Sequence, residues 1–182
     1  MPLNPIAELE AGRAFYADAM PGSDVGHFAA MWHVFTVGHL VATDLDRIAR
    51  RHGLSIADLH LLGTLRIERP LPLRATDLAL TLHVSNAVLS ARIERLGRIG
   101  LLIRTPSPTD RRAFDLALTP EGIAMVDVAI ADITRDGSFA RHFRRLPEAD
   151  RAVLARIMGQ IHVGLDREFV AVARGDAQGP EG

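Results

Sequence analysis

Apolar positions recur at helical spacing along most of the chain. The clearest run covers residues 26–51, which contain no proline and are apolar over more of their surface than a solvent-facing helix needs. A short amphipathic stretch precedes it, and further helices are expected at residues 56–66 and 75–82. A last long helix is expected over residues 148–172, where apolar residues again recur every three or four positions.

A helix, two strands and another helix follow in the middle of the chain. Ser85 is a good N-cap for a helix that runs to about Ile99. The buried stripe of this helix is expected to consist of Leu89, Ile93 and Leu96. Residues 101–105 and 113–118 are expected to form strands on either side of a polar loop.

The second strand is indicated by alternation and the next helix by its start signal. Phe114, Leu116 and Leu118 occupy every other position of the strand. Thr119 is a suitable N-cap for a helix over residues 120–134, which begins with proline. The expected order is therefore α-α-α-α-β-β-α-α.

This order predicts a mainly α protein with a small β-hairpin. A helix, a tight link, a second helix and a hairpin make a winged helix-turn-helix, here flanked by helical arms. The expected division is into N-terminal dimerisation helices, a winged domain, C-terminal dimerisation helices and a disordered tail. These parts cover residues 1–52, 53–119, 120–173 and 174–182.

Composition narrows the class of protein. The 182 residues include no cysteine, which excludes a disulfide framework and thiolate metal sites and favours a reducing, cytoplasmic compartment. The N-terminus has no secretory pattern, and no stretch of eighteen uncharged apolar residues indicates a membrane span. We expect no cofactor.

Charge is unevenly distributed. All 21 basic residues are arginine, and nine of them fall between residues 66 and 112 against four acids, a net charge of +5. The remainder carries a net charge of −6. A basic middle segment between acidic ends fits a polyanion partner, although a solvated charged face would give the same count.

The middle segment contains residues suited to double-stranded DNA. A recognition helix presents side chains near its N-terminus to base edges in the major groove, and a cationic loop can enter the minor groove. Arg95, like Arg92, is placed for a phosphate or for internal pairing, and Asp110 is expected to pin the wing loop. The expected DNA contacts are Arg74, Ser85, Asn86, Val88, Ser90, Arg95, Arg111 and Arg112.

From about Gly53 to Gly122 the chain resembles the MarR family of bacterial transcriptional regulators. The similarity covers "HGLSIADLHLLGTL", "ATDLALTLHVSNAVLSARIERLGRIGLLIR" and "DRRAFDLALTPEG". The family signature, Asp-x-Arg in the wing followed by a strand and Leu-Thr-x-x-Gly, is matched at Asp110, Arg112, Leu118, Thr119 and Gly122. Two positions depart from it: Arg74 lies in a weaker cap before the third helix, and Gly97 lies late in the recognition helix, where it could permit close packing.

The resemblance implies a homodimer that reads a pseudo-palindromic operator, with arms from the first long helix and the last two. Packing of these helices within one chain is the alternative. It also implies a repressor released by a small aromatic or phenolic anion bound between the arms and the winged domain. Ordinary packing explains the same candidate effector residues, which are Trp32, His33, Phe35, His39, His60 and Arg92.

Catalysis and metal binding have little support. The sequence contains no motif for a nucleophile elbow, a phosphate-binding loop or a dinucleotide fingerprint, so we expect that the protein is not an enzyme. His27, His33 and His39 are six residues apart, which places them off a common helix face. The remaining alternative is a winged-helix protein-interaction module that does not bind DNA.

Overall fold

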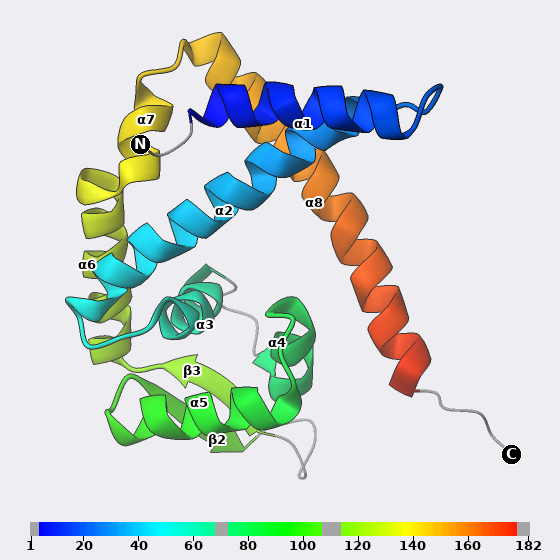
Figure 1. The fold of residues 1–182 in the computed structure, drawn as a ribbon. Coiled ribbons are helices and arrows are strands. Elements are labelled where there is room, and N and C mark those ends of the chain that lie inside the picture. Colours follow the sequence, from blue (N-terminus) through cyan, green and yellow to red (C-terminus); the bar gives the residue numbers. More distant parts are fainter. Residues whose placement is uncertain (1–3, 68–72, 107–113, 178–182) are drawn as a thin grey trace, which may run out of the picture. The chain divides into compact units, whose positions relative to one another are not determined.

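A computed structural model describes residues 4–67, 73–106 and 114–177 (Figure 1). These residues belong to two compact units, residues 1–44 and residues 45–182. In chain order the elements are α1 (Pro5–Ala19), α2 (Gly26–Arg50), α3 (Ile56–Ile67), β1 (Leu73–Arg74), α4 (Ala75–Thr81), α5 (Asn86–Arg98), β2 (Leu102–Pro106), β3 (Phe114–Leu118), α6 (Pro120–Asp136), α7 (Ser138–Arg144) and α8 (Glu148–Ala177).

The first unit contains α1 and most of α2. Asn4 caps α1 by accepting the backbone N–H of Ile6 on its side-chain oxygen at 3.0 Å, and proline fills the first helical position. The rings of Tyr16 and Phe28 lie 4.0 Å apart between centroids and join the two helices. Phe35 on α2 remains 73% exposed, so this unit leaves large apolar side chains without cover.

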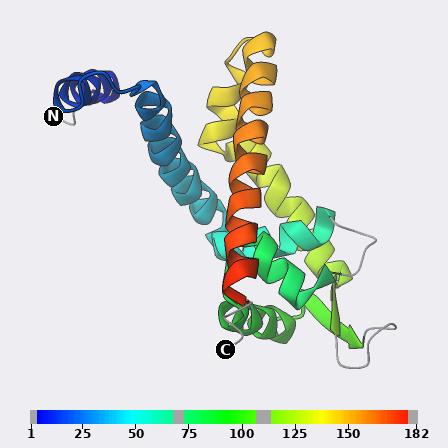
Figure 2. The same cartoon turned by 90° about the vertical axis from the view of Figure 1, so that its right-hand side faces the viewer.

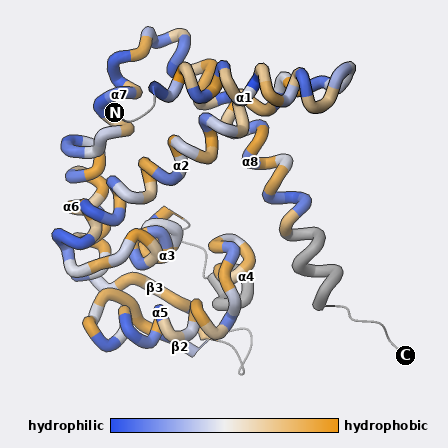
Figure 3. The backbone as a smooth tube through the Cα atoms, viewed as in Figure 1, coloured by the Kyte–Doolittle hydropathy of each residue, from blue (hydrophilic) through white to orange (hydrophobic). Residues whose placement is uncertain are grey.

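The second unit has a continuous hydrophobic core built mainly from α3, α4, α5 and the strands. Buried and exposed positions alternate at helical spacing, and Figure 3 shows hydrophobic and hydrophilic residues interleaved along these helices. Glycines end the preceding segments: Gly53 after α2 and Gly100 after α5 have φ of 69° and 77°. The largest fully buried side chains are Ile48, Leu61, Leu62, Leu78, Leu89, Ile93, Leu96, Leu102 and Val126.

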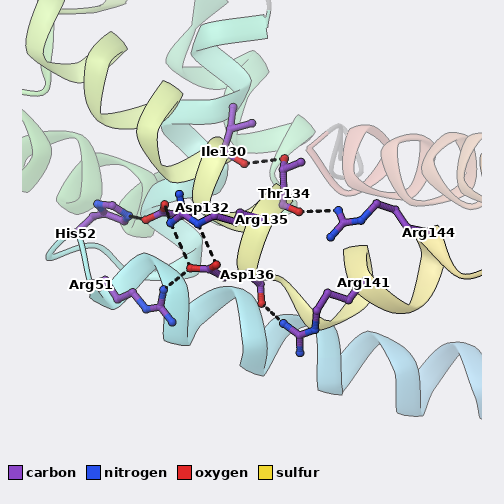
Figure 4. A network of polar contacts seen from close by, with 9 residues as sticks. All are labelled: Arg51, His52, Ile130, Asp132, Thr134, Arg135, Asp136, Arg141 and Arg144. Carbon is purple, nitrogen blue, oxygen red and sulfur yellow. Dashed lines mark hydrogen bonds and ion pairs between the residues drawn. The ribbon is translucent and has the colours of Figure 1, made fainter.

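Charged groups join the turn that follows α2 to α6 (Figure 4). His52 Nε2 lies 3.0 Å from an oxygen of Asp132, and Arg51 pairs with Asp136 at 2.8 Å. Arg135 bonds to both aspartates, and hydrogen bonds from Arg135 and then Arg51 lower the pKa of Asp136. The end of α2 therefore belongs to the same body as the winged domain.

The sheet has three strands in the order β1-β3-β2, all antiparallel. β2 and β3 form the expected hairpin, with Leu102 opposite Leu118 and Pro106 opposite Phe114. The two-residue β1 extends the hairpin. The sequence did not predict this strand, because the surrounding "RPLPLR" only indicates the end of the preceding helix. β2 and β3 lie at an edge of the domain (Figure 2).

The start of α6 packs tightly on the start of β2. Thr119 accepts the backbone N–H of Gly122 on its hydroxyl oxygen at 2.9 Å, as an N-cap, and donates the hydroxyl to the carbonyl of Gly100 at 2.7 Å. A Cβ on Gly122 would lie 1.9 Å from the carbonyl oxygen of Leu101. Glycine is therefore required at this position by the close approach of two backbones.

Several sequence-based expectations need correction. The helix α7 was not predicted, and α8 extends to Ala177 instead of Val172, so it includes the first residues of the tail expected to be disordered. Residues 178–182 of that tail lie outside the described part. Phe114 is 55% exposed, although the alternation placed it with Leu116 and Leu118 on the buried side. An alanine Cβ at Gly97 would meet Leu102 at ordinary distances, so close packing does not require that glycine.

In the described ranges, none of the helices combines the length and apolar character needed to cross a bilayer.

Candidate nucleic-acid interface

The recognition helix α5 is defined by its cap and its buried stripe. Ser85 accepts the backbone N–H of Val88 at 3.3 Å and has extended backbone geometry, as predicted. Leu89, Ile93 and Leu96 are at most 2% exposed, which confirms the predicted stripe. The helix is therefore fixed in the core along one side and free along the other.

The side chains predicted to read bases lie on that free side. Asn86 and Ser90 are exposed one turn apart, so both amide and hydroxyl are accessible to a partner. Val88 is 49% exposed on another part of the helix surface. Ser85 is also exposed, but its hydroxyl oxygen is engaged as the cap. These positions suit major-groove contacts near the N-terminus of a helix.

The two arginines in the middle of α5 are held by an acid of α3. Arg95 forms an ion pair with Asp58, and Arg92 Nε lies 3.8 Å from the other oxygen of the same carboxylate. The sequence placed Arg95 at a phosphate or in an internal pair, and the structure has the internal pair. A depression of about 680 Å³ adjoins this cluster. Its lining consists of Arg50, Gly53, Leu54, Ser55, Asp58, Val88, Ala91, Arg92 and Arg95.

Two aspartates hold the beginning of α3 next to this depression. Asp46 accepts the backbone N–H of Ile56 at 3.0 Å and Nε of Arg50 at 2.6 Å, and these bonds lower the pKa of Asp46. Asp58 accepts the backbone N–H and the hydroxyl of Ser55. Sequence reasoning missed Asp58, although a Ser followed three residues later by an acid is the capping-box signal.

The wing is described along its strands. Arg104 on β2 is exposed and adds a cation that sequence reasoning did not single out. Arg74 lies on β1 with its Cα opposite that of Asp115 on β3. Asp110, Arg111 and Arg112 lie outside the described residues, so the proposed loop contacts stay predictions.

The candidate effector residues fall in both units. Trp32, His33, Phe35 and His39 lie on the part of α2 in the first unit, all exposed. His60 and Arg92 belong to the second unit. The pKa of His60 is lowered, first by desolvation and then by the positive charges of Arg92 and His83. The structure thus places Arg92 and His83 close enough to His60 for their charges to act on it. The role of all six candidates in effector binding stays a prediction.

A helix-turn-helix with a core-anchored second helix, followed by an edge hairpin, defines a winged helix-turn-helix protein. Residues 52–113 match the family model described as MarR family. The HTH-type transcriptional regulator PecS of Dickeya dadantii is 28% identical over 113 residues, which cover 62% of this chain and 68% of PecS. Over residues 52–113 the chain is therefore similar to the MarR family of transcriptional regulators.

Solved structures share the fold. The MepR–DNA complex of Staphylococcus aureus superposes with a TM-score of 0.62 at 19% identity, over 74% of this chain and 96% of MepR. CouR of Rhodococcus jostii bound to p-coumaroyl-CoA gives a TM-score of 0.61 at 24% identity, over 76% of this chain and 92% of CouR. These likenesses confirm the predicted architecture of helices around a winged domain.

Proposed function

We propose that the protein is a sequence-specific, DNA-binding transcriptional regulator of the cytoplasm that acts as a homodimer. The observation that carries this function is α5, whose apolar stripe is buried while Asn86, Val88 and Ser90 are exposed on it. The basic segment 66–112 supplies the counter-charge for phosphates. MepR, which shares the fold, was solved in complex with DNA.

Dimerisation is supported by an uncovered apolar face on α8. One stripe of its large apolar side chains recurs mostly every three or four residues, and its members are between about one-third and two-thirds exposed. They are Val153, Leu154, Ile157, Met158, Ile161, Leu165 and Phe169. A second copy of the chain would bury this face and place two recognition helices on two half-sites of a pseudo-palindrome.

The regulator acts as a repressor that a small aromatic or anionic effector releases from DNA. Arg92 and His83 lie close enough to His60 for their charges to lower its pKa, which favours an anion beside them, and Trp32 and Phe35 offer aromatic surface on α2. CouR holds p-coumaroyl-CoA in its crystal structure. A thermal-shift screen of aromatic carboxylates, phenols and acyl-CoA thioesters tests the effector class, with duplex release as the second readout.

The residue roles in DNA binding are tested by Arg112→Ala and Asn86→Ala. Arg112 contacts the backbone or minor groove, so its loss should weaken binding to all duplexes and flatten the salt dependence of log K by about one unit. Asn86 contacts base edges, so its replacement should change sequence preference, at a cost of about 1–3 kcal/mol on the preferred duplex. Anisotropy titrations over a range of salt concentrations measure both.

The two variants serve as controls for each other. An unchanged salt slope in Arg112→Ala would reject its backbone or groove role. Unchanged sequence preference in Asn86→Ala, assayed by selection from a random pool, would reject base contact by that amide.

A further inference from the structure

Asp58 is the most deeply buried charged residue among those described. Its exposed fraction is 4%, and it lies in the first turn of α3. One oxygen accepts the N–H and the hydroxyl of Ser55 at 2.8 and 2.6 Å, and the Ser55 hydroxyl oxygen in turn accepts the N–H of Asp58 at 3.1 Å. The carboxylate thus closes a reciprocal cap at the start of α3.

The same carboxylate reaches across to the recognition helix. It pairs with Arg95 and lies 3.8 Å from Nε of Arg92, and these two arginines follow each other by nearly one turn on α5. Arg92 is 17% exposed and Arg95 40% exposed in their side chains. The position of α5 relative to α3 is therefore tied to one acid.

Asp58 retains its charge in this setting. Burial raises the pKa of the carboxyl, but the hydrogen bonds from Ser55 and Arg95 outweigh burial, and the net pKa is lowered. A buried carboxylate is costly without its cation, so the pair resists opening even when a phosphate competes for the arginine.

A third arginine on α5 provides a contrast. Arg98 pairs with Glu94 at 3.2 Å, but the two side chains are 70% and 72% exposed. Exposed pairs of this kind contribute little free energy and exchange easily with other partners. Arg98 is consequently available to a polyanion, whereas Arg95 is not.

We propose that Asp58 is a specificity-determining positioning residue. Its buried carboxylate withdraws Arg92 and Arg95 from the phosphate backbone and fixes α5 on α3. Cations that bind phosphates attract DNA of any sequence, so their withdrawal lowers non-specific binding and leaves readout to Asn86, Val88 and Ser90. This inference rests on the proposed DNA-binding function.

The test is a salt titration of the full chain on a random-sequence duplex. Asp58→Asn keeps an acceptor for Ser55 but loses the charge that holds Arg95. It should bind random DNA several-fold more tightly at low salt and steepen the salt dependence of log K by about one unit. The matched control is Asp127→Asn, which removes another arginine-paired carboxylate, that of Arg66, and changes net charge equally. It should leave the slope unchanged.

A second comparison does not depend on Asp58→Asn folding. Arg95→Ala should show the same dependence of log K on log salt as the wild-type protein. Arg98→Ala should show a slope that is flatter by about one unit. A third comparison does require folded Asp58→Asn: in an Asp58→Asn/Arg95→Ala double variant, the added steepness should disappear.

The outcomes distinguish failure of the proposed role of Asp58 from failure of the proposed DNA-binding function. Equal effects of Asp58→Asn and Asp127→Asn, or a flatter slope for Arg95→Ala, would overturn the role of Asp58 and leave the proposed function standing. Failure of the wild-type protein to bind any duplex would overturn the proposed function, and this inference with it.

Discussion

Gly122→Ala should destabilise the winged domain by at least about 3 kcal/mol. The new Cβ would lie 1.9 Å from the carbonyl oxygen of Leu101 and 2.9 Å from its carbonyl carbon. Neither atom can move freely, because that oxygen also accepts the N–H of Thr119 at 3.2 Å and the N–H of Leu101 is bonded to Leu96 at 3.0 Å. Relief of the overlap requires separation of α6 from β2.

Chemical denaturation at a fixed protomer concentration measures this loss, since the apparent stability of a dimer depends on concentration. Gly63→Ala is the matched control. It lies inside α3, and a Cβ there would meet nothing within 4 Å, so up to about 1 kcal/mol should be gained from helix propensity. Equal midpoints for the two variants would refute the close approach at Gly122.

Leu96→Ala should reduce the free energy of unfolding by about 2–5 kcal/mol. Leu96 is 0% exposed and belongs to the core cluster that includes Leu61 and Leu102. Truncation leaves a cavity under the recognition helix, which the neighbouring side chains can fill in part at most. The apparent affinity for DNA should also fall at temperatures near the lowered midpoint of unfolding.

Val88→Ala separates packing from readout on the same helix. Val88 is 49% exposed, so its truncation should change stability by less than about 0.5 kcal/mol. Its proposed contact with a thymine methyl group would be lost, so sequence preference should change while the melting curve does not. Similar destabilisation by Leu96→Ala and Val88→Ala would mean that α5 is not anchored through its apolar stripe.

Local signals were sufficient for much of the fold. Ser85 and Thr119 cap α5 and α6 as predicted. Gly53 and Gly100 adopt left-handed backbone geometry after the ends of α2 and α5. Such signals act within a few residues and are visible in the sequence. β1 was missed because two residues carry no periodicity, and the pairing of Leu73 with Leu116 depends on tertiary contact.

The interface was less accessible from sequence than the fold. Spacing along α5 identified the exposed side of the helix, because one stripe of three apolar residues fixes the orientation of the rest. It could not decide whether Arg95 faces a phosphate or a protein partner, because the deciding residue, Asp58, lies on another helix. The role of the candidate effector residues depends similarly on how α2 and the winged domain of two chains are arranged.

The most direct test is the affinity of the wild-type full chain for a random-sequence duplex as salt is raised. In the proposed dimer Arg111 and Arg112 of both chains contact DNA, so tight binding at low salt is expected. Its log K should fall linearly with log salt, with a slope steeper than about −3. Absence of binding at low salt would contradict DNA recognition and favour a winged-helix module that binds protein partners instead.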